Sequence, residues 1–555
     1  MPTSFWSAAS RSEAANPSRG RPARQVRLMP GPRFVDAEEI ARAIPDGAHL
    51  LTVGMTLSGA SEAVLRALED RFLHEEHQAD LTLIHASGQS NRQDGIQHLA
   101  HEGMVRRIIG SHWGLAPRWM DLIATNRVIA YCLPQGQVTH WFRSMASGLP
   151  GHLTQIGLET FIDPRVEGGK MNARTRPEPD LIRVVQVEGR EYLWIEAVRV
   201  DWVLVRGTLA DDRGNIAAPE EAMKLEILPA VFAGRRYDGR IVAQVKHVVP
   251  RGTLNPRNVE IPGAHVHFIT VAKNAERDHR QTSSFVFEPR FSSCGWDPSL
   301  ADAAVRPLDV RRVIGRRAML ELAAGDIVNM GTGIPNDVIG PEVLNEEAGD
   351  LVTLTVESGV YGGRPLGGID FGIAEYPDAL IEHPYQFDFY NGHGVDITFM
   401  GFGEADREGN VNATKLGERA TGAGGFIDIT QQARTVVFCG TFTAQGVDVT
   451  AGDGRLTIRR EGAVRKWVER VQQLSFNGAR ALANGQRVLV VTERAVVQLT
   501  PAGWTVVEVA PGVDLERDVL GQMAFRPALA DPVREVPPAI YSEARLGLRA
   551  RLMGD

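Results

Sequence analysis

A glutamate that follows a buried strand is the residue of this sequence best placed to do covalent chemistry. Residues 351–356 form an uninterrupted apolar, β-branched run, which is typical of a strand buried in a parallel sheet. Glu357, Ser358 and Gly359 follow that run directly. Open α/β sheets bind ligands beyond the carboxyl ends of their strands, and a desolvated carboxylate can attack an activated acyl group. Glu357 is therefore a candidate nucleophile, although a glutamate that simply reaches solvent at a strand end fits the pattern equally well.

Two turns offer the hydrogen-bond donors that such chemistry would need. Residues 422–425 read Gly-Ala-Gly-Gly, a turn in which bare backbone approaches a ligand closely and presents N–H groups to an oxyanion. Gln135 follows the apolar strand predicted over residues 127–132 and places a side-chain amide at the edge of its sheet. Taken singly, an ordinary turn or a surface amide would explain each of them.

A third glycine turn, GTGIPNDVIG at residues 331–340, looks like a dinucleotide-binding loop only superficially. The third glycine of GxGxxG is displaced, and no acidic residue ends a strand about 20 residues later. A P-loop is excluded because no GK[ST] follows. Gly331 and Gly333 therefore predict a tight turn between a strand and a helix. No GxSxG elbow occurs, which argues against a hydrolase of the Ser-His-Asp type.

No metal site is expected from the histidines and cysteines. The HEEH segment at residues 74–77 has its histidines three positions apart in a polar helical pattern, which favours a solvated helix surface. Cys132, Cys294 and Cys439 are far apart and show no CxxC spacing. An odd number of separated cysteines fits a reducing compartment, so a cytoplasmic protein without metal or other cofactor is expected.

The composition narrows the class of protein further. Apolar residues make up 43% and charged residues 23% of the chain, as in ordinary globular proteins. The net charge of −8 argues against a nucleic-acid binder, and no apolar run reaches the ~18 residues of a membrane span. Residues 1–28 carry five arginines and a single acid. This resembles a mitochondrial transit peptide, but the proline and glycine content favours a disordered leader.

The helices, strands and turns indicate one α/β unit used twice. Residues 35–56 and 308–333 share the plan of helix, break, apolar strand and glycine turn. ADDRGN at 210–215 has a counterpart in ADREGN at 405–410. The interval from the glycine turn to this motif is much longer in the first half than in the second, so the first unit is enlarged.

A chain of 555 residues is also too long for a single hydrophobic core. We therefore expect two tandem, related open α/β domains with mostly parallel sheets, the first domain enlarged. The expected boundaries are a leader at 1–28, the N-terminal domain at 29–272, a linker at 273–305, the C-terminal domain at 306–530 and an extension at 531–555.

Together these segments resemble family I coenzyme A transferases of the single-chain acetate/propionate type, in which the two subunits of 3-oxoacid transferases are fused. The resemblance covers residues from about 31 to 521. It is carried by LPQG (133–136), TVESGVYGG (355–363), GNVNATK (409–415) and GAGGFIDITQQARTVVFCGTFTA (422–444).

The resemblance implies a ping-pong reaction that moves CoA between short-chain acids. Glu357 would be the catalytic glutamate and would carry CoA as a glutamyl thioester, with no metal or other cofactor. Gln135 and the backbone N–H of Gly424 would stabilise the oxyanion. The residues implied to contact CoA are Gly331, Gly333, Gly422 and Gly425. Tyr361 and Arg364 depart from the family pattern and are expected to reshape the acyl pocket.

Two alternatives remain open at this level. An acyl-CoA hydrolase would use the same glutamate but complete the cycle with water, and a non-catalytic acyl-CoA-binding protein would use only the fold. The expected partners are acyl-CoA and carboxylic acids, with neither nucleic acid nor membrane. A homodimer or homotetramer is expected, and the identity of the acids is not indicated.

Overall fold

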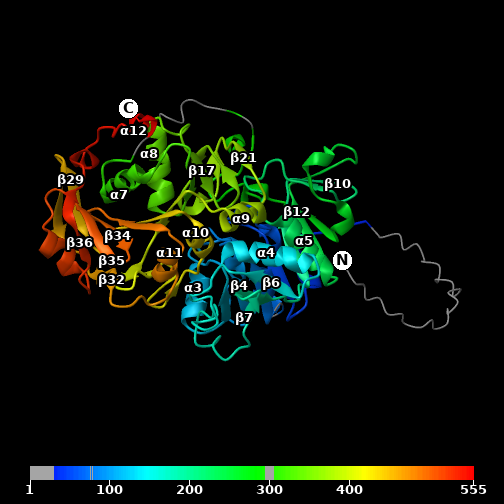
Figure 1. The fold of residues 1–555 in the computed structure, drawn as a ribbon. Helices are drawn as coiled ribbons and strands as arrows, with labels where there is room; N and C mark the ends of the chain where they lie inside the picture. Colours follow the sequence, from blue (N-terminus) through cyan, green and yellow to red (C-terminus); the bar gives the residue numbers. More distant parts are fainter. Residues whose placement is uncertain (1–30, 76, 78, 294, 296–305, 555) are drawn as a thin grey trace, which may run out of the picture.

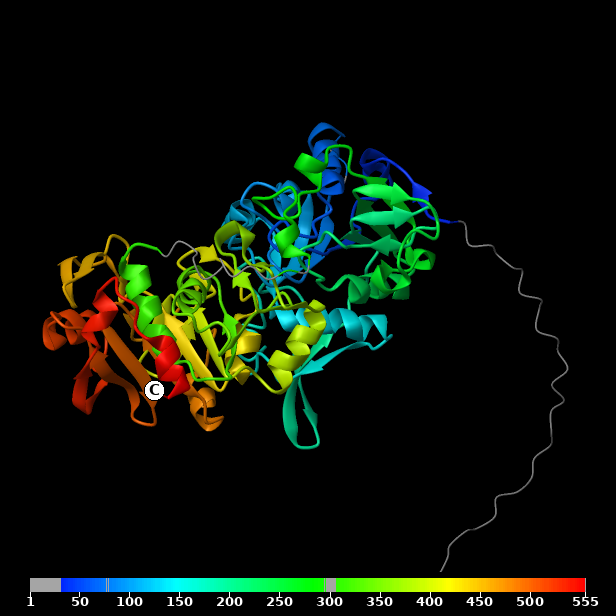
Figure 2. The same ribbon diagram turned by 90° about the horizontal axis from the view of Figure 1, so that it is seen from above.

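The computed structural model describes residues 31–75, 77, 79–293, 295 and 306–554. The predicted leader and residues 296–305 of the predicted linker lie outside this part of the chain. The first half (blue to green) and the second half (green to red) lie side by side, as Figure 1 and Figure 2 show. No helix among the described residues has the length and apolar character needed to cross a membrane.

The first half is built on an eight-stranded parallel sheet in the order β1-β15-β12-β9-β2-β3-β4-β5. Strands β3, β5 and β9 are buried along their whole length, as expected of apolar strands in a covered parallel sheet. The bounds are β1 Arg33–Phe34, β2 His49–Thr52, β3 Leu81–His85, β4 Val105–Gly110, β5 Ile129–Cys132, β9 Trp202–Arg206, β12 Arg240–Val245 and β15 Phe268–Val271.

The second half is built on a ten-stranded mixed sheet in the order β21-β18-β17-β16-β22-β27-β33-β34-β35-β36. Its middle strands, β17 to β33, pair in parallel, whereas β18, β21 and β34 pair antiparallel. The bounds are β16 Ile327–Met330, β17 Thr353–Val356, β18 Val360–Tyr361, β21 Ala379–Leu380, β22 Ile397–Gly401, β27 Thr435–Cys439, β33 Arg487–Val491, β34 Ala495–Thr500, β35 Gly503–Val509 and β36 Ala528–Glu535.

The predicted duplication is visible in the strand order. Five consecutive strands of the first sheet, β15-β12-β9-β2-β3, have the counterparts β33-β27-β22-β16-β17 in the second. The two related turns also fold alike. In each, an aspartate side chain (Asp211 or Asp406) accepts the N–H groups of the residues two and four positions later, at 2.9 to 3.0 Å. The mixed α/β fold with two related sheets is as expected.

The enlargement of the first half extends its sheet beyond β3. It supplies β4, β5 and helix α4 (Gln135–Ala146), and then the small antiparallel sheet of β6 (Gly151–Thr154), β7 (Ile182–Val187) and β8 (Arg190–Glu196). In the second half, β17 is followed instead by the short antiparallel strands β18 and β21. At the other end of the chain, β36 is an edge strand of the second sheet, so part of the expected extension belongs to the domain itself.

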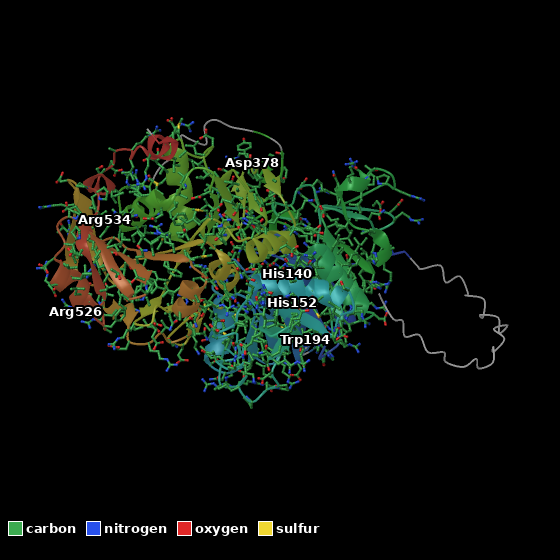
Figure 3. All side chains as sticks on the ribbon, in the orientation of Figure 1. His140, His152, Trp194, Asp378, Arg526 and Arg534 are labelled. Carbon is green, nitrogen blue, oxygen red and sulfur yellow. The ribbon has the colours of Figure 1, made fainter. Side chains whose placement is uncertain are left out.

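The two halves meet where α4 packs against α9 (His383–Gly392) and α10 (Phe426–Gln432) (Figure 1). His140 and Arg143 of α4 both contact the carboxylate of Asp388 in α9, at 2.9 and 2.8 Å. Figure 3 labels His140 at this central position, beside His152 of β6. The contact between the halves is therefore polar as well as apolar.

The glycine-rich loop at residues 422–425 is tied by its backbone to the first half. The Gly424 N–H donates to the Ser111 carbonyl oxygen at 2.9 Å, and the Gly424 carbonyl accepts the Gln135 N–H at 2.9 Å. The Trp113 N–H donates to the Thr421 carbonyl at 2.7 Å. Since this loop begins α10 of the second half, its conformation depends on both halves.

Replacing Gly422 by alanine tests this junction. Gly422 has φ +80°, and a Cβ atom there would collide with the Ser111 carbonyl oxygen and lie 3.1 Å from His112 Cα. Gly503 has φ +94° but nothing within 4 Å of an added Cβ, so Gly503→Ala is the matched control for backbone strain alone. Left-handed backbone costs a non-glycine residue roughly 1–2 kcal/mol, and Gly422→Ala should lower the Tm clearly further than Gly503→Ala. Equal losses of Tm would contradict a tight junction at this loop.

Candidate active site

A cavity of about 410 Å³ lies between the two halves and collects the predicted site residues. Glu357, Gln135, Gly424, Gly331, Gly422 and Gly425 all line it, whereas Gly333 is not part of the lining. The other lining residues are Met55, Thr56, Gly88, His112, Gly114, Leu115, Thr332, Gly368, Phe371, Met400, Gly401, Phe402, Gly403, Ala413, Leu416, Thr421, Ala423, Phe426 and Ile429. Among the described residues, the lining contains no lysine or arginine, so these residues offer no fixed positive charge to a ligand.

Glu357 begins the turn after β17, and the residue is 7% exposed. Its Oε2 atom is buried and has no hydrogen-bond partner among the described residues. Burial, with a smaller contribution from the negative charge of Asp428, raises the pKa of Glu357 to about 7. A hydrogen bond from the Glu357 backbone N–H to its own carboxylate lowers the pKa in part, so the carboxylate has one local donor, while its Oε2 atom remains poorly solvated and available to react.

The turn that presents Glu357 is fixed by its two neighbours. The Ser358 hydroxyl donates to the Gly372 carbonyl. Gly359 has φ +100°, and a Cβ there would overlap the Ile381 carbonyl oxygen. The small residues of the Glu-Ser-Gly motif are therefore required by the local backbone, and Glu357 is the residue left free to reach the cavity.

The first half has a related turn without the carboxylate. Strand β3 is the counterpart of β17, and the residues that follow it are Ala86, Ser87 and Gly88. Ala86 thus stands where the second half has Glu357, and Gly88 lines the same cavity. The Ala-Ser-Gly segment at residues 86–88 therefore repeats the Glu-Ser-Gly segment at residues 357–359 with alanine in place of glutamate. The chain carries one such glutamate rather than two.

The glycine loop presents its residues to different neighbours. A Cβ on Gly424 would lie 3.8 Å from Gln135 Oε1 and 3.8 Å from His112 Cδ2. A Cβ on Gly425 would lie 3.5 Å from Glu357 Cγ. The Gly424 N–H is engaged with the Ser111 carbonyl, whereas the Gly425 N–H makes no hydrogen bond within the described part of the chain. Gly425 is therefore the glycine beside the nucleophile.

His112 and Asp428 were missed by sequence reasoning. Burial, aided by the charge of Arg419, lowers the pKa of His112 to about 4, so its imidazole is neutral in the cavity. Burial raises the pKa of Asp428 to about 6, although it accepts hydrogen bonds from Gly136 N–H at 3.0 Å and Gln137 Nε2 at 2.7 Å. The contacts of both residues are long-range, and no local motif marks them.

The residues expected to reshape the acyl pocket lie elsewhere. Arg364 forms an ion pair with Glu375, and neither Tyr361 nor Arg364 lines the cavity. The Lys415 ammonium group donates to the Met171 carbonyl at 3.3 Å and is also absent from the lining. The shape of the pocket is set instead by aromatic and methionine side chains such as Phe402 and Met400.

One cluster outside the cavity has the residue types of a metal site. Ligand atoms of Glu62, Asp94 and His98 lie within 4.8 Å of one another. Burial alone would lower the pKa of His98, but hydrogen bonds to Glu62 and Glu69 outweigh it and raise the pKa to about 9. Arg66 also pairs with Asp94 at 2.5 Å. The protonated His98 and Arg66 therefore already balance the negative charge of these carboxylates.

Comparison with known proteins identifies the class of this site. The family model for coenzyme A transferase matches residues 35–272. The chain is 39% identical over 526 residues to caffeate CoA-transferase of Acetobacterium woodii, an alignment that covers 93% of this chain and 98% of that protein. The chain belongs to the coenzyme A transferase family and is a CoA-transferase, as the resemblance implied.

Further relatives cover the same length. Acetate CoA-transferase YdiF of Escherichia coli (strain K12) is 35% identical, with 95% of this chain and 98% of the relative aligned. The crystal structure of the acyl-CoA transferase YdiF apoenzyme from E. coli O157:H7 superposes with a TM-score of 0.87 at 33% identity, covering 93% of this chain and 97% of that one. The structure of the thioester complex of the same enzyme with CoA superposes with a TM-score of 0.86. These relatives are transferases by name and do not favour the alternatives of hydrolysis or binding alone.

The raised pKa of Glu357 predicts how this residue affects stability. A carboxyl group whose pKa is about 7 in the native state and 4.5 in the unfolded chain loses its proton less readily in the native state. The ionised carboxylate therefore lowers the free energy of unfolding by its full amount above pH 7. This loss of stability shrinks as the pH falls from 7 and is gone below about 4.5. Glu357→Gln should therefore raise the Tm at pH 8, by on the order of a few degrees, and less at pH 5.5.

Thermal unfolding monitored at both pH values measures the effect. Glu188→Gln is the matched control, because Glu188 is exposed in the β7–β8 turn and its replacement should change the Tm little at either pH. A Glu357→Gln protein that is no more stable than the parent at pH 8 would show that the carboxylate is better solvated than its burial indicates.

Proposed function

We propose that this enzyme transfers CoA from an acyl-CoA to a monocarboxylic acid by a ping-pong reaction through a glutamyl-CoA thioester on Glu357. The observation that carries the proposal is the buried Glu357 carboxylate, whose Oε2 atom has no hydrogen-bond partner among the described residues, in a cavity shared with Gln135 and the glycine loop. A carboxylate held in this way is reactive toward an acyl thioester and has few competing partners.

The reaction follows from the chemistry of the carboxylate. A Glu357 oxygen attacks the thioester carbonyl, the C–S bond breaks, and an acyl–glutamyl anhydride and CoA thiolate form. The thiolate then attacks the glutamyl carbonyl, which releases the acyl group as its carboxylate and leaves CoA on Glu357 as a thioester. A second carboxylate reverses these steps, so no net proton and no redox partner are required.

Each attack creates an oxyanion, for which the site offers two donors. Gln135 Nε2 is a side-chain donor from the first half. The Gly424 N–H implied by the family resemblance already donates to Ser111, whereas the adjacent Gly425 N–H is uncommitted and next to Glu357. We therefore place the backbone donor at Gly425, with Gly331 and Gly422 contacting CoA. Loss of one oxyanion donor typically costs about 10²–10³ in rate.

The experiment that tests the proposal traps the intermediate. The protein is incubated with acetyl-CoA or propionyl-CoA, reduced with borohydride, digested and analysed by mass spectrometry. Borohydride converts a glutamyl thioester to a primary alcohol, so the peptide that contains Glu357 should change mass only when acyl-CoA was present. The Glu357→Gln protein should show no reduced peptide and no transfer above background.

A quantitative assay separates transfer from hydrolysis. The newly formed CoA thioester is measured against free CoA while the acceptor acid is varied. Product thioester that follows the acceptor supports the proposal. Free CoA that accumulates regardless of acceptor, with Glu357 still labelled, would show a hydrolase instead.

The charge of the cavity predicts which acids are used. The part of the chain that the structure describes places no lysine or arginine in the lining, and His112 is neutral there. A second carboxylate on the substrate would be buried without a partner, which costs several kcal/mol. Butyrate should therefore be used with a kcat/KM at least roughly 10-fold higher than that of succinate, a ratio that corresponds to 1.4 kcal/mol.

Monomethyl succinate is the matched control substrate, because it keeps the four-carbon chain of succinate, adds only an ester methyl group and carries a single charge. It should be used far better than succinate and approach butyrate. If succinate and its monomethyl ester were used equally well, charge in the cavity would not determine acid selection.

A further inference from the structure

We infer that Glu226 and His383 are positioning residues that hold the Gln135 amide in its donating orientation, an inference that rests on the function proposed above. Gln135 Nε2 lies 2.9 Å from His383 Nε2. His383 Nδ1 lies 2.7 Å from Glu226 Oε2. The three side chains thus form a single hydrogen-bonded chain that begins at a buried carboxylate and ends at the cavity.

The proton positions along this chain follow from its carboxylate end. A carboxylate oxygen can only accept, so the proton of a neutral His383 ring resides on Nδ1. Nε2 then carries a lone pair and accepts one proton of the Gln135 NH₂ group. The second proton of the same NH₂ group remains available in the cavity that Gln135 lines. Glu226 therefore determines which atom of the Gln135 amide faces His383, and so which atoms face the substrate.

Burial makes this arrangement selective. Glu226 and His383 are 0% exposed and Gln135 is 2% exposed. At such sites, hydrogen bonds are not exchanged with water, and a reversed amide would place Gln135 Oε1 against the lone pair of His383 Nε2. The reversed orientation would also leave the oxyanion facing an oxygen. The chain thus stabilises one of the two amide orientations.

The backbone around Glu226 is arranged to bring it to His383. Glu226 precedes α5 (Ile227–Arg236) and follows Leu225, whose φ of +54° is uncommon for a leucine. The Leu225 carbonyl accepts the His383 backbone N–H at 3.0 Å. His383 is therefore held twice, by its backbone at Leu225 and by its ring at Glu226. Strained backbone of this kind persists where the surrounding structure fixes it, often beside functional sites.

The contact crosses the junction between the halves. Glu226 and Gln135 belong to the first half, and His383 begins α9 of the second half. Gln135 is also held at its backbone N–H by the Gly424 carbonyl at 2.9 Å. The second half therefore fixes both the main chain and the side chain of a donor that the first half supplies. Hydrogen bonds that served only to join the halves would not need to end at Gln135, the one side-chain amide that lines the cavity among the described residues.

The test is a double-mutant cycle on the full-length enzyme. Glu226→Gln keeps the size of the side chain but can donate to His383 Nδ1, which moves the ring proton to Nε2 and removes the acceptor for Gln135. We expect kcat to fall by about 10- to 100-fold while KM for acyl-CoA changes less than about twofold, as for residues that orient a catalytic group. Gln135→Ala alone should lower kcat by about 10²–10³.

The decisive comparison is the double variant. If Glu226 acts through Gln135, Gln135→Ala with Glu226→Gln should be no slower than Gln135→Ala alone. If the two fold-losses of kcat multiply in the double variant, the inference is overturned, because a purely structural role of Glu226 would lower kcat whether or not Gln135 is present. Glu62→Gln is the matched control: it alters another buried histidine–carboxylate pair, 2.6 Å apart, outside the cavity, and should leave kcat unchanged even if the Tm falls.

A neutron crystal structure of Glu226→Gln, which distinguishes the nitrogen and the oxygen of an amide, keeps this inference testable apart from the proposed function. The Gln135 side chain should leave its 2.9 Å contact with His383 Nε2 or reverse its amide. An unchanged Gln135 would overturn the positioning role even if the enzyme proved to use other substrates. If acyl-CoA left Glu357 unlabelled but the Gln135 side chain moved in Glu226→Gln, the proposed function would be refuted and the positioning role of Glu226 and His383 would be retained.

Discussion

The structure depends on keeping one carboxylate out of water without giving it a counter-ion. A buried acid normally acquires an arginine or several N–H donors, because an unpaired charge in an apolar environment is costly. Glu357 instead has an unpartnered oxygen and a pKa raised to about 7. The native state can tolerate this only if the surrounding framework is stable by other means. The two large sheets, with apolar strands buried along much of their length, supply that framework.

The two halves contribute unequally to the site, and the inequality explains how a repeated unit became a single catalytic centre. After equivalent strands, the second half carries Glu357 and the first half carries Ala86. The first half, in turn, has the additional strands β4 and β5 and helix α4, which bring His112 and Gln135 to the same cavity. One copy thus supplies the nucleophile and the other the side-chain donor. Neither half holds a complete site, so both must dock correctly for chemistry to occur.

Much of this arrangement could be predicted from the sequence because it is local. The strand and turn around Glu357, the glycine loops and the duplicated turn at Asp211 and Asp406 are each specified within a few residues. Such motifs can be recognised in a sequence because a positive φ favours glycine and a buried parallel strand favours a run of apolar residues. Six of the seven residues predicted for the site line the cavity, whereas Gly333 lies outside the lining.

The remainder could not be predicted because its partners are remote in the sequence. Gln135 and His383 are 248 residues apart, and Glu226 and His383 are 157 apart. No periodicity links such residues, and a glutamate at a helix start or a histidine before a proline has ordinary explanations. The absence of cationic groups in the lining, likewise, is a property of many segments together and of no single motif.

The polar character of the junction has a physical reason beyond adhesion. An apolar seam would hold the halves together equally well, but it would tolerate small changes in their relative position. Hydrogen bonds are directional and weaken steeply when misaligned, so buried polar contacts such as Gly424 to Ser111 and Asp428 to Gly136 allow one docking geometry. Catalysis by preorganised donors requires that degree of positional definition, since a donor displaced by an ångström no longer meets the developing charge. The junction is therefore where the stability of the fold and the reactivity of Glu357 are determined together.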